Sequence, residues 1–400
     1  MILPAAPISP DSTVPGAPDI TLSGKPAPGE LAFRFTGSGS EYLRIWLVNL
    51  LLTVLTLGIY SAWAKVRREK FFHQNTRLAG ASFDYHGRPM VILRGRLIAF
   101  ALLALAQLDF VPPAVRGIAT LLLLALLPLL MQRSLRFRLA NTSYRGVRFS
   151  FTGTAGGAYK LFGGYLAAAA LWLLVMGGLL SLVVRTSALG AALTPLLVLG
   201  LMLMFPMMHA SWRRFVIDHA RFGVEAFGVQ LRRREFVWIY LLAVGAWMAV
   251  LLAVAAVFAL SGTASSLFGV GGADDSPLAR TLVFTAGLLL YATAAAITPI
   301  ITARVQNLSL SRTRIGPHRL VSRLPVAAFV RLQLTNLVLT VITLGLYRPF
   351  AAVATARMRV TALSLVPDGS VDDILASIAA SRDVAVGSEA MDLLGIDLSL

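Results

Sequence analysis

Long apolar runs separated by short basic stretches dominate the chain. A helix needs about 20 apolar residues to cross the hydrocarbon core of a bilayer. Four runs reach this length, at Gly163–Val183, Leu189–His209, Val237–Leu260 and Thr281–Thr302. Strands of a membrane barrel would instead alternate apolar and polar residues over about ten positions. The pattern therefore predicts transmembrane helices.

Two shorter runs flank Pro112–Pro113, which cannot continue a helix. A single helix over residues 97–131 would be about 52 Å long, too long for a bilayer. A tight turn at the prolines fits better. The chain then contains three transmembrane helical hairpins, at 97–131, 163–209 and 237–302, and one further apolar segment at each end, at 43–63 and 326–352.

The basic residues orient these hairpins. The linkers 64–96, 132–162, 210–236 and 303–325 carry 8, 6, 6 and 5 Lys or Arg, whereas each hairpin tip carries one. Positive charge is retained on the cytoplasmic side of membrane proteins. We therefore expect a multi-pass protein of a bacterial inner membrane with its basic linkers in the cytoplasm.

Composition agrees with a membrane protein and narrows the chemistry. The 400 residues are 57% hydrophobic and 14% charged, with a mean hydropathy of +0.74. The net charge of +17 sits in the linkers, which favours anionic lipid over nucleic acid as the partner. Cysteine is absent, the five histidines do not sit at ligand spacing, and no catalytic motif is present. We expect no metal, no cofactor and no enzymatic activity.

The two ends of the chain differ in composition from the membrane domain, 33–365. Residues 1–32 are rich in Pro, Gly and Ala, which predicts a disordered leader. Residues 366–400 carry seven acidic residues against Arg382, which predicts an acidic cytoplasmic tail.

Internal repeats are the most informative feature of the sequence. The stretch from Asn49 to Tyr60 recurs from Asn336 to Tyr347 with nine identities in twelve positions. A second cassette, an Asn-Thr pair followed by Gly and an aromatic run, begins at Asn75 and again at Asn141. Its aromatic residues alternate, so it reads either as a short strand in a small cytoplasmic sheet or as an interfacial anchor for the next helix.

The two end segments leave the topology open. If 43–63 and 326–352 both span the bilayer, the chain crosses eight times and both termini lie outside. If both re-enter or lie in the interface, six helices cross, both termini are cytoplasmic, and the repeated Gly58 and Gly345 are the turn points. Non-helical backbone at that depth must be shielded by protein.

Three polar residues within apolar segments are candidate functional residues. Asn49 and Asn336 are nearly central in their segments and pseudo-equivalent, so they serve either as hydrogen-bonding contacts between helices or in a substrate pathway. Asp109 lies beside the Pro112–Pro113 break, where it reaches the outer interface, pairs with Arg116 or takes part in a pathway. Linker residues that suit anionic headgroups are Lys65, Arg67, Arg68, Lys70, Arg133, Arg136, Arg138, Arg213 and Arg214.

The sequence resembles the YjgN-type family of bacterial inner-membrane proteins, a domain of unknown function (DUF898). The residues that carry the resemblance are Phe-Thr-Gly-Ser-Gly-Ser-Glu-Tyr at 35–42, Thr-Leu-Gly-Ile-Tyr-Ser-Ala-Trp-Ala-Lys-Val-Arg at 56–67, Asn-Thr-Arg-Leu at 75–78, and Arg-Ser-Leu-Arg-Phe at 133–137 with Asn-Thr-Ser-Tyr-Arg-Gly at 141–146. The second half matches less closely: Arg348-Pro-Phe350 stands where the first repeat has Ser61-Ala-Trp63. The resemblance implies an inner-membrane location and no mechanism.

We therefore predict an all-α polytopic membrane protein with three transmembrane hairpins, two pseudo-equivalent end segments and small cytoplasmic β elements. The function classes that fit are transport of a small solute or lipid handling. The alternative is a non-catalytic scaffold that binds anionic lipid or a protein partner through its basic cytoplasmic face. A cavity that reaches Asn49 and Asn336 would favour the first class, and the oligomeric state stays open.

Overall fold

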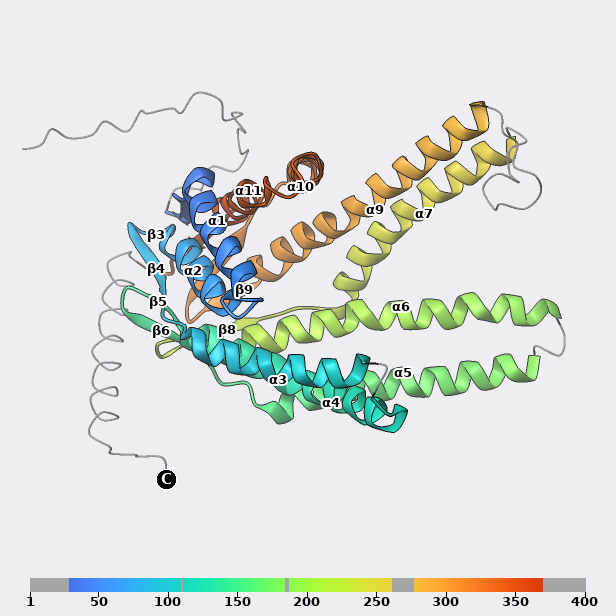
Figure 1. The fold of residues 1–400 in the computed structure, drawn as a ribbon, viewed down its shortest axis with the longest axis horizontal. Coiled ribbons are helices and arrows are strands. Elements are labelled where there is room, and N and C mark those ends of the chain that lie inside the picture. Colours follow the sequence, from blue (N-terminus) through green and yellow to red (C-terminus); the bar gives the residue numbers. More distant parts are fainter. Residues whose placement is uncertain (1–28, 109–110, 184–186, 261–276, 370–400) are drawn as a thin grey trace, which may run out of the picture.

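The computed structural model describes residues 29–108, 111–183, 187–260 and 277–369. Asp109, nearly all of the leader and most of the acidic tail lie outside the described residues. Within them, helices predominate, and they occur in consecutive pairs that leave one β-sheet and return to it (Figure 1).

Three long helical hairpins form the membrane part. Their helices are α3 (Pro89–Gln107) with α4 (Pro113–Ala140), α5 (Ala155–Val183) with α6 (Ser187–Asp218), and α7 (Arg233–Leu260) with α9 (Pro277–Ser311). Six stretches on these helices are long and apolar enough to cross a membrane. Large apolar side chains along all three hairpins are exposed, as expected for surfaces that face lipid.

The strands form one continuous sheet of eleven strands at the base of the hairpins, at the left of Figure 1. Between Thr76 and Ser322 the strands form four successive antiparallel hairpins, and the second strand of each hairpin pairs in antiparallel fashion with the first strand of the next. The strands are β1 (Leu31–Ala32), β2 (Arg34–Phe35), β3 (Thr76–Leu78), β4 (Ala81–Tyr85), β5 (Thr142–Tyr144), β6 (Val147–Phe151), β7 (Ala220–Phe222), β8 (Glu225–Val229), β9 (Thr313–Ile315), β10 (His318–Ser322) and β11 (Leu363–Val366).

The sheet curls until its two ends meet. Strand β1 pairs with β11 at one end of the strand order, and β2 pairs with β3 at the other end. Only Phe33 separates β1 from β2, and its N–H donates to the carbonyl of Leu363 at 3.1 Å. The sheet is therefore a nearly closed ring without a long free edge.

Alternate side chains of the strands point into this ring and enclose an apolar cavity of about 220 Å³. Aromatic rings pack around its wall at tilted angles, for example Phe83 against Tyr144 and Phe149 against Phe222, with centroids 4.7 and 4.8 Å apart. The aromatic residues of the repeated cassette, Phe83 and Phe149, therefore pack with one another in the sheet.

The two end segments are shorter helical pairs, α1 (Gly39–Leu55) with α2 (Ser61–Gln74), and α10 (Val326–Ile342) with α11 (Arg348–Thr361). The strands on either side of α1 and α2 pair with each other, and so do those on either side of α10 and α11. Each segment therefore returns to the side of the sheet from which it starts. Helices α1 and α10 run across the direction of α5 and α6 (Figure 1).

The turns of the two end segments are the same. Thr56 Oγ1 accepts from Tyr60 N–H at 2.9 Å, and Thr343 Oγ1 accepts from Tyr347 N–H at 3.0 Å. Gly58 and Gly345 have φ of +91° and +94°, a conformation that favours glycine. The nine identities shared by these stretches thus include the residues that make the turn.

Three details of the predicted architecture are corrected. The chain is mostly helical as predicted, but the short cassettes join into one large, nearly closed sheet of eleven strands, where only small β elements were expected. The sheet begins at Leu31, inside the range assigned to the leader, and ends at Val366, the first residue assigned to the tail. Many basic residues assigned to linkers lie on helices that continue past the apolar run, as Arg133 and Arg136 do on α4.

Candidate functional site

A cavity of about 620 Å³ lies among α1, α2, α3 and α11, and we call it the Asn49 cavity. The turn at Gly58 folds α2 back along α1, so that side chains of both helices face the same space. Helix α11 packs against α1 and supplies Arg348 and Ala352, and α3 supplies Arg96. The lining residues are Tyr42, Trp46, Asn49, Leu50, Thr53, Ser61, Ala64, Lys65, Arg68, Glu69, Arg96, Arg348 and Ala352.

Positive charge predominates in the Asn49 cavity. The lining carries four cations and one carboxylate, so its formal charge is +3 (four cations minus one anion). The cations are Lys65, Arg68, Arg96 and Arg348, and the carboxylate is that of Glu69. Like charges in one space repel, and an anion placed among them relieves that repulsion. The lining is cationic and apolar at once, because aromatic and aliphatic residues of α1 form the rest of the wall.

Two of the four cations are held by neighbouring side chains. Arg96 Nη1 donates to Ser61 Oγ at 2.5 Å, which links the membrane helix α3 to the first residue of α2. The guanidinium of Arg68 lies 5.8 Å from the ring centroid of Phe72, a cation–π distance. These contacts orient two guanidinium groups whose planar donors suit a phosphate or a carboxylate.

A second cavity, of about 470 Å³, lies among α9, α10 and α11, and we call it the Asn336 cavity. Arg348 lines both cavities. Arg359 lies in this second cavity, and its Nε donates to Gln306 Oε1 at 2.7 Å. Burial lowers the pKa of Arg359 from its ordinary value. Hydroxyl groups take the place of most of the cations here, at Thr298, Thr302, Thr340 and Thr355.

The two asparagines are buried and incompletely satisfied. Asn49 is 7% exposed and Asn336 is 4% exposed, and within the described part of the chain neither Oδ1 atom has a hydrogen-bond partner. The Nδ2 of Asn336 lies 3.4 Å from Thr355 Oγ1 and 3.5 Å from the carbonyl of Ala351. An unsatisfied buried polar atom is costly and marks a place where water, a ligand or a rearrangement supplies the partner.

The structure brings some predicted residues together and separates others. Asn49, Lys65 and Arg68 share one cavity, whereas Asn336 lies in the other. Arg67 lies over the ring of Tyr60 at 5.6 Å, outside both linings, and Arg214 pairs with Asp218 at 3.1 Å. Lys70, Arg133, Arg136, Arg138 and Arg213 line neither cavity. Asp109 lies outside the described residues.

Sequence reasoning missed Arg96 and Arg348. The signal for Arg96 was its position next to the apolar run of α3, where we counted it only as a linker charge. Arg348 replaces Ser61 at the corresponding position of the second repeat, and that departure from the family pattern was a usable signal. Among the described residues, no group of three His, Asp or Glu side chains could hold a metal ion.

Six spanning-length helices mounted on one sheet define a polytopic membrane protein. Residues 30–393 match the model of the family described as bacterial protein of unknown function (DUF898), so the chain belongs to this family. It is similar to inner membrane protein YjgN of Salmonella typhimurium, at 28% identity over 49% of this chain and 51% of that protein. It is also similar to inner membrane protein YjgN of Escherichia coli K12, at 39% identity over 30% of this chain.

The matched regions span about half of the Salmonella protein and 31% of the Escherichia coli protein. No solved structure matches the chain. Family membership and the six apolar helices place the chain in the inner membrane as a multi-pass protein. The relatives are named for their location alone, so the activity has to be argued from the cavities.

Proposed function

We propose that this chain binds the phosphate headgroup of an anionic phospholipid in the Asn49 cavity and takes part in lipid handling at the inner membrane. The observation that carries the proposal is a cavity lined by four cations, one carboxylate and an apolar wall. A phosphate diester with two acyl chains has the complementary chemistry, since it combines one negative charge with a large apolar surface.

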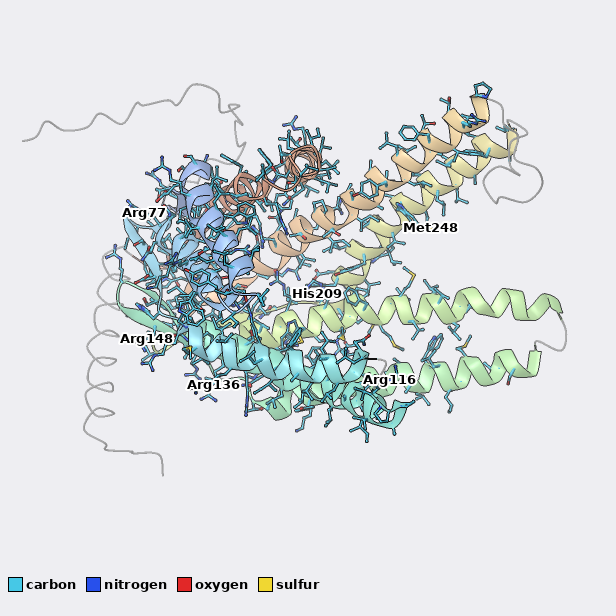
Figure 2. All side chains as sticks on the ribbon, in the orientation of Figure 1. Arg77, Arg116, Arg136, Arg148, His209 and Met248 are labelled. Carbon is cyan, nitrogen blue, oxygen red and sulfur yellow. The ribbon has the colours of Figure 1, made fainter. Side chains whose placement is uncertain are left out.

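The position of the cavity supports this choice of ligand. We place the sheet on the cytoplasmic side, because the basic residues gather there and positive charge is retained on that side. Arg77, Arg136 and Arg148 lie toward the sheet end of the molecule, and Arg116 lies far from it along the hairpin of α3 and α4 (Figure 2). Helices α1 and α10, which run crosswise, then lie at the level of the headgroups.

The surface around the cavity supports a route for the acyl chains. Leu57 and Leu344, at the two turns, are 95% and 94% exposed, which is favourable only against lipid or an apolar partner. Helix α1 also exposes a row of large apolar residues beside the cavity: Leu47, Val48, Leu50, Leu51, Val54 and Leu55. A lipid with its phosphate among the cations would lay its chains along this row.

The buried amide of Asn49 adds a preference within the class of anionic lipids. Its unpartnered Oδ1 requires a donor, and the glycerol headgroup of phosphatidylglycerol carries hydroxyl donors beside its phosphate.

Passage of a small anionic solute is the second candidate function, because Arg348 lines both cavities and offers a shared contact. The alternative function, a scaffold that binds no ligand, does not explain why the chain forms these cavities. Both candidates are non-catalytic.

The test is binding of phosphatidylglycerol to the purified full-length chain in detergent, measured by native mass spectrometry. Arg96→Gln and Arg68→Gln each remove one cation from the cavity. The matched control for Arg96→Gln is Arg94→Gln on α3, and the matched control for Arg68→Gln is Arg67→Gln on α2. Each control removes one positive charge outside the lining of the cavity. We expect the cavity variants to weaken binding about tenfold, the equivalent of about 1.4 kcal/mol, and the controls to leave it within about twofold.

Two further arms separate the sources of the phosphate. Zwitterionic phosphatidylcholine tests the need for net negative charge, and water-soluble glycerol phosphate tests the need for acyl chains. Tighter binding of glycerol phosphate than of the lipid would support solute passage instead of lipid handling. Equal losses in the cavity variants and the controls would contradict both candidates, since the cations would then act only through net charge.

A further inference from the structure

The outer wall of the sheet carries a set of arginines that the proposed function does not use. Phe33, Leu78 and Leu320 line the inner cavity, so their strand neighbours point outward. Five exposed arginines among the outward residues form a set that we call the arginine belt: Arg34, Arg77, Arg221, Arg314 and Arg319. Arg77 lies at the outside of the sheet end (Figure 2).

The belt contains two pairs of like charges in direct register. Arg34 is opposite Arg77 in the pairing of β2 with β3, and Arg314 is opposite Arg319 in the pairing of β9 with β10. Like charges directly opposite each other destabilise a sheet. Within the described residues, no salt bridge to a carboxylate relieves any of the five belt arginines. The arrangement points to an anionic partner.

The path of the chain places a suitable partner between the two pairs. Strand β11 lies between β10 on one side and β1 on the other, and β1 continues into β2. Arg319 is in register with Val366, the last residue of β11. The N–H of Asp368 then donates to His318 Nδ1 at 3.2 Å. The tail therefore leaves the sheet with one arginine pair on each side of its exit.

We propose that the acidic tail, residues 370–400, docks on the arginine belt of its own chain and shields it from other polyanions. The tail carries six acidic residues and Arg382, a formal charge of −5 (six minus one) against five belt arginines. Asp372 and Asp373 follow Gly369 by three and four residues, a reach of about 10–13 Å. Lipid and nucleic acid would compete with the tail for the same arginines.

Length does not limit this docking. The 31 residues of the tail reach about 100 Å when extended. The ten intervals between the eleven strands of the sheet span about 48 Å at the usual spacing between strands. Every arginine of the belt is therefore within reach from the exit beside β11, and the tail can engage both pairs without strain.

The experiment uses the absence of cysteine from the chain. A spin label at Ser388→Cys reports the mobility of the tail in the full-length protein, at about 0.1 M and about 1 M salt, where the Debye lengths are about 10 and 3 Å. A second label at Ser82→Cys, exposed on β4, gives the distance between the tail and the sheet wall. We expect an immobilised label and a narrow distance distribution at low salt, and both features lost at high salt.

Two variants with the same change in charge separate the belt from general electrostatics. The belt variant carries Arg34→Gln, Arg77→Gln, Arg314→Gln and Arg319→Gln, and the control variant carries Arg67→Gln, Lys70→Gln, Arg133→Gln and Arg136→Gln. We expect the docked fraction of the tail to fall at least about threefold in the belt variant only. Asp372→Asn with Asp373→Asn, which leaves the sheet intact, is expected to act in the same direction.

Three outcomes would overturn the proposal. The tail label could be equally mobile at both salt concentrations, or the belt and control variants could free it equally. Alternatively, the tail could stay mobile while anionic nanodiscs immobilise the label at Ser82→Cys, in which case the belt contacts the membrane. None of these outcomes depends on lipid binding in the Asn49 cavity, so this proposal and the proposed function fail separately.

Discussion

The two end segments share a turn and differ in the cavities that they help to form. Both place a glycine with φ above +90° after an apolar helix of 17 residues, and both bury an asparagine seven residues before the threonine of the turn. Both cavities have apolar walls, but the Asn49 cavity adds four cations to its wall, whereas the Asn336 cavity adds two arginines and four threonine hydroxyl groups.

The difference comes from residues outside the repeated stretch, on the second helix of each segment and on the neighbouring helices. The segment of α1 and α2 lies beside α3, which contributes Arg96, and α2 itself carries Lys65 and Arg68. The segment of α10 and α11 lies beside α9, which contributes Thr298 and Thr302. A repeated sequence thus specifies the same backbone twice, and the surroundings of each copy decide which ligand it suits. Ligand preference cannot be read from the repeat alone.

The largest effect that tests this comparison is expected at the turns. Gly58→Ala and Gly345→Ala each place a Cβ in open space or at an ordinary contact distance, so the change acts on the backbone conformation alone. We predict that each lowers the free energy of unfolding by about 1–2 kcal/mol, the cost of a left-handed conformation with a Cβ. Thermal stability in detergent measures this, and the two losses should agree.

The matched control is Gly95→Ala on α3. Gly95 is helical, and a Cβ there meets no atom within 4 Å. Replacing a glycine in the middle of a helix by alanine is expected to raise the free energy of unfolding by about 0.5–1 kcal/mol. If Gly58→Ala behaved like Gly95→Ala, the shared turn would not be set by its glycine, and the comparison would lose its basis.

An intermediate effect is expected at the asparagines. Asn49→Leu removes an unpartnered polar atom from a buried position, so we predict that the ligand-free protein becomes more stable by about 1 kcal/mol and binds phosphatidylglycerol more weakly. Asn336→Leu also removes two long contacts, so its gain should be about 0.5 kcal/mol or less. Stability and lipid binding are measured on the same samples.

A loss of stability in Asn49→Leu would show that the amide is satisfied by water within the protein. The cavity would then be a hydrated structural site, and the preference for a hydroxylated headgroup would have no support. An equal increase in the free energy of unfolding in the two variants would show that Asn49 and Asn336 lie in equivalent environments. The two cavities would then not differ in the way that their lining residues indicate.

Much of the helical architecture was predictable from the chain because lipid imposes a length and a composition on each spanning helix. The turn at Pro112–Pro113 separates α3 from α4 as the sequence indicates. The helix ends were not predictable, because α4 continues for nine residues beyond Met131 through basic residues to reach the sheet. Apolar runs report where lipid lies, and they do not report where the helix stops.

The closed sheet could not be predicted for a different reason. Each cassette supplies only two short strands, and their pairing depends on distant partners: Phe83 and Tyr144 are 61 residues apart, and Phe227 and Ile315 are 88 residues apart. The closing pair joins Leu31 to Leu365 across nearly the whole chain. Asn49, Lys65 and Arg68 were recognised singly, but the fold that brings them together with Arg348 is equally non-local.

The smallest predicted effect concerns the entries to the two segments, where equivalent positions after the strand carry Thr36 and Arg323. Thr36 Oγ1 donates to Asn75 Oδ1 at 3.1 Å, whereas Arg323 forms a two-pronged ion pair with Glu30, both contacts at 2.7 Å. The Arg323 side chain is 42% exposed, so water screens this ion pair. We therefore expect Arg323→Ala to lower the free energy of unfolding by at most about 0.5 kcal/mol, and Thr36→Ala by less.

The pH dependence of this ion pair has a definite sign. The hydrogen bond to Glu30 is the main cause that raises the pKa of Arg323 above its ordinary value. A base whose pKa is raised on folding stabilises the protein below its unfolded pKa and loses that contribution only as the pH rises through the folded pKa. The stability difference between Arg323→Ala and the parent should therefore be the same at about pH 7 and about pH 9. A difference that shrinks between these values would mean that another group, and not this pair, joins the N-terminal strand to β10.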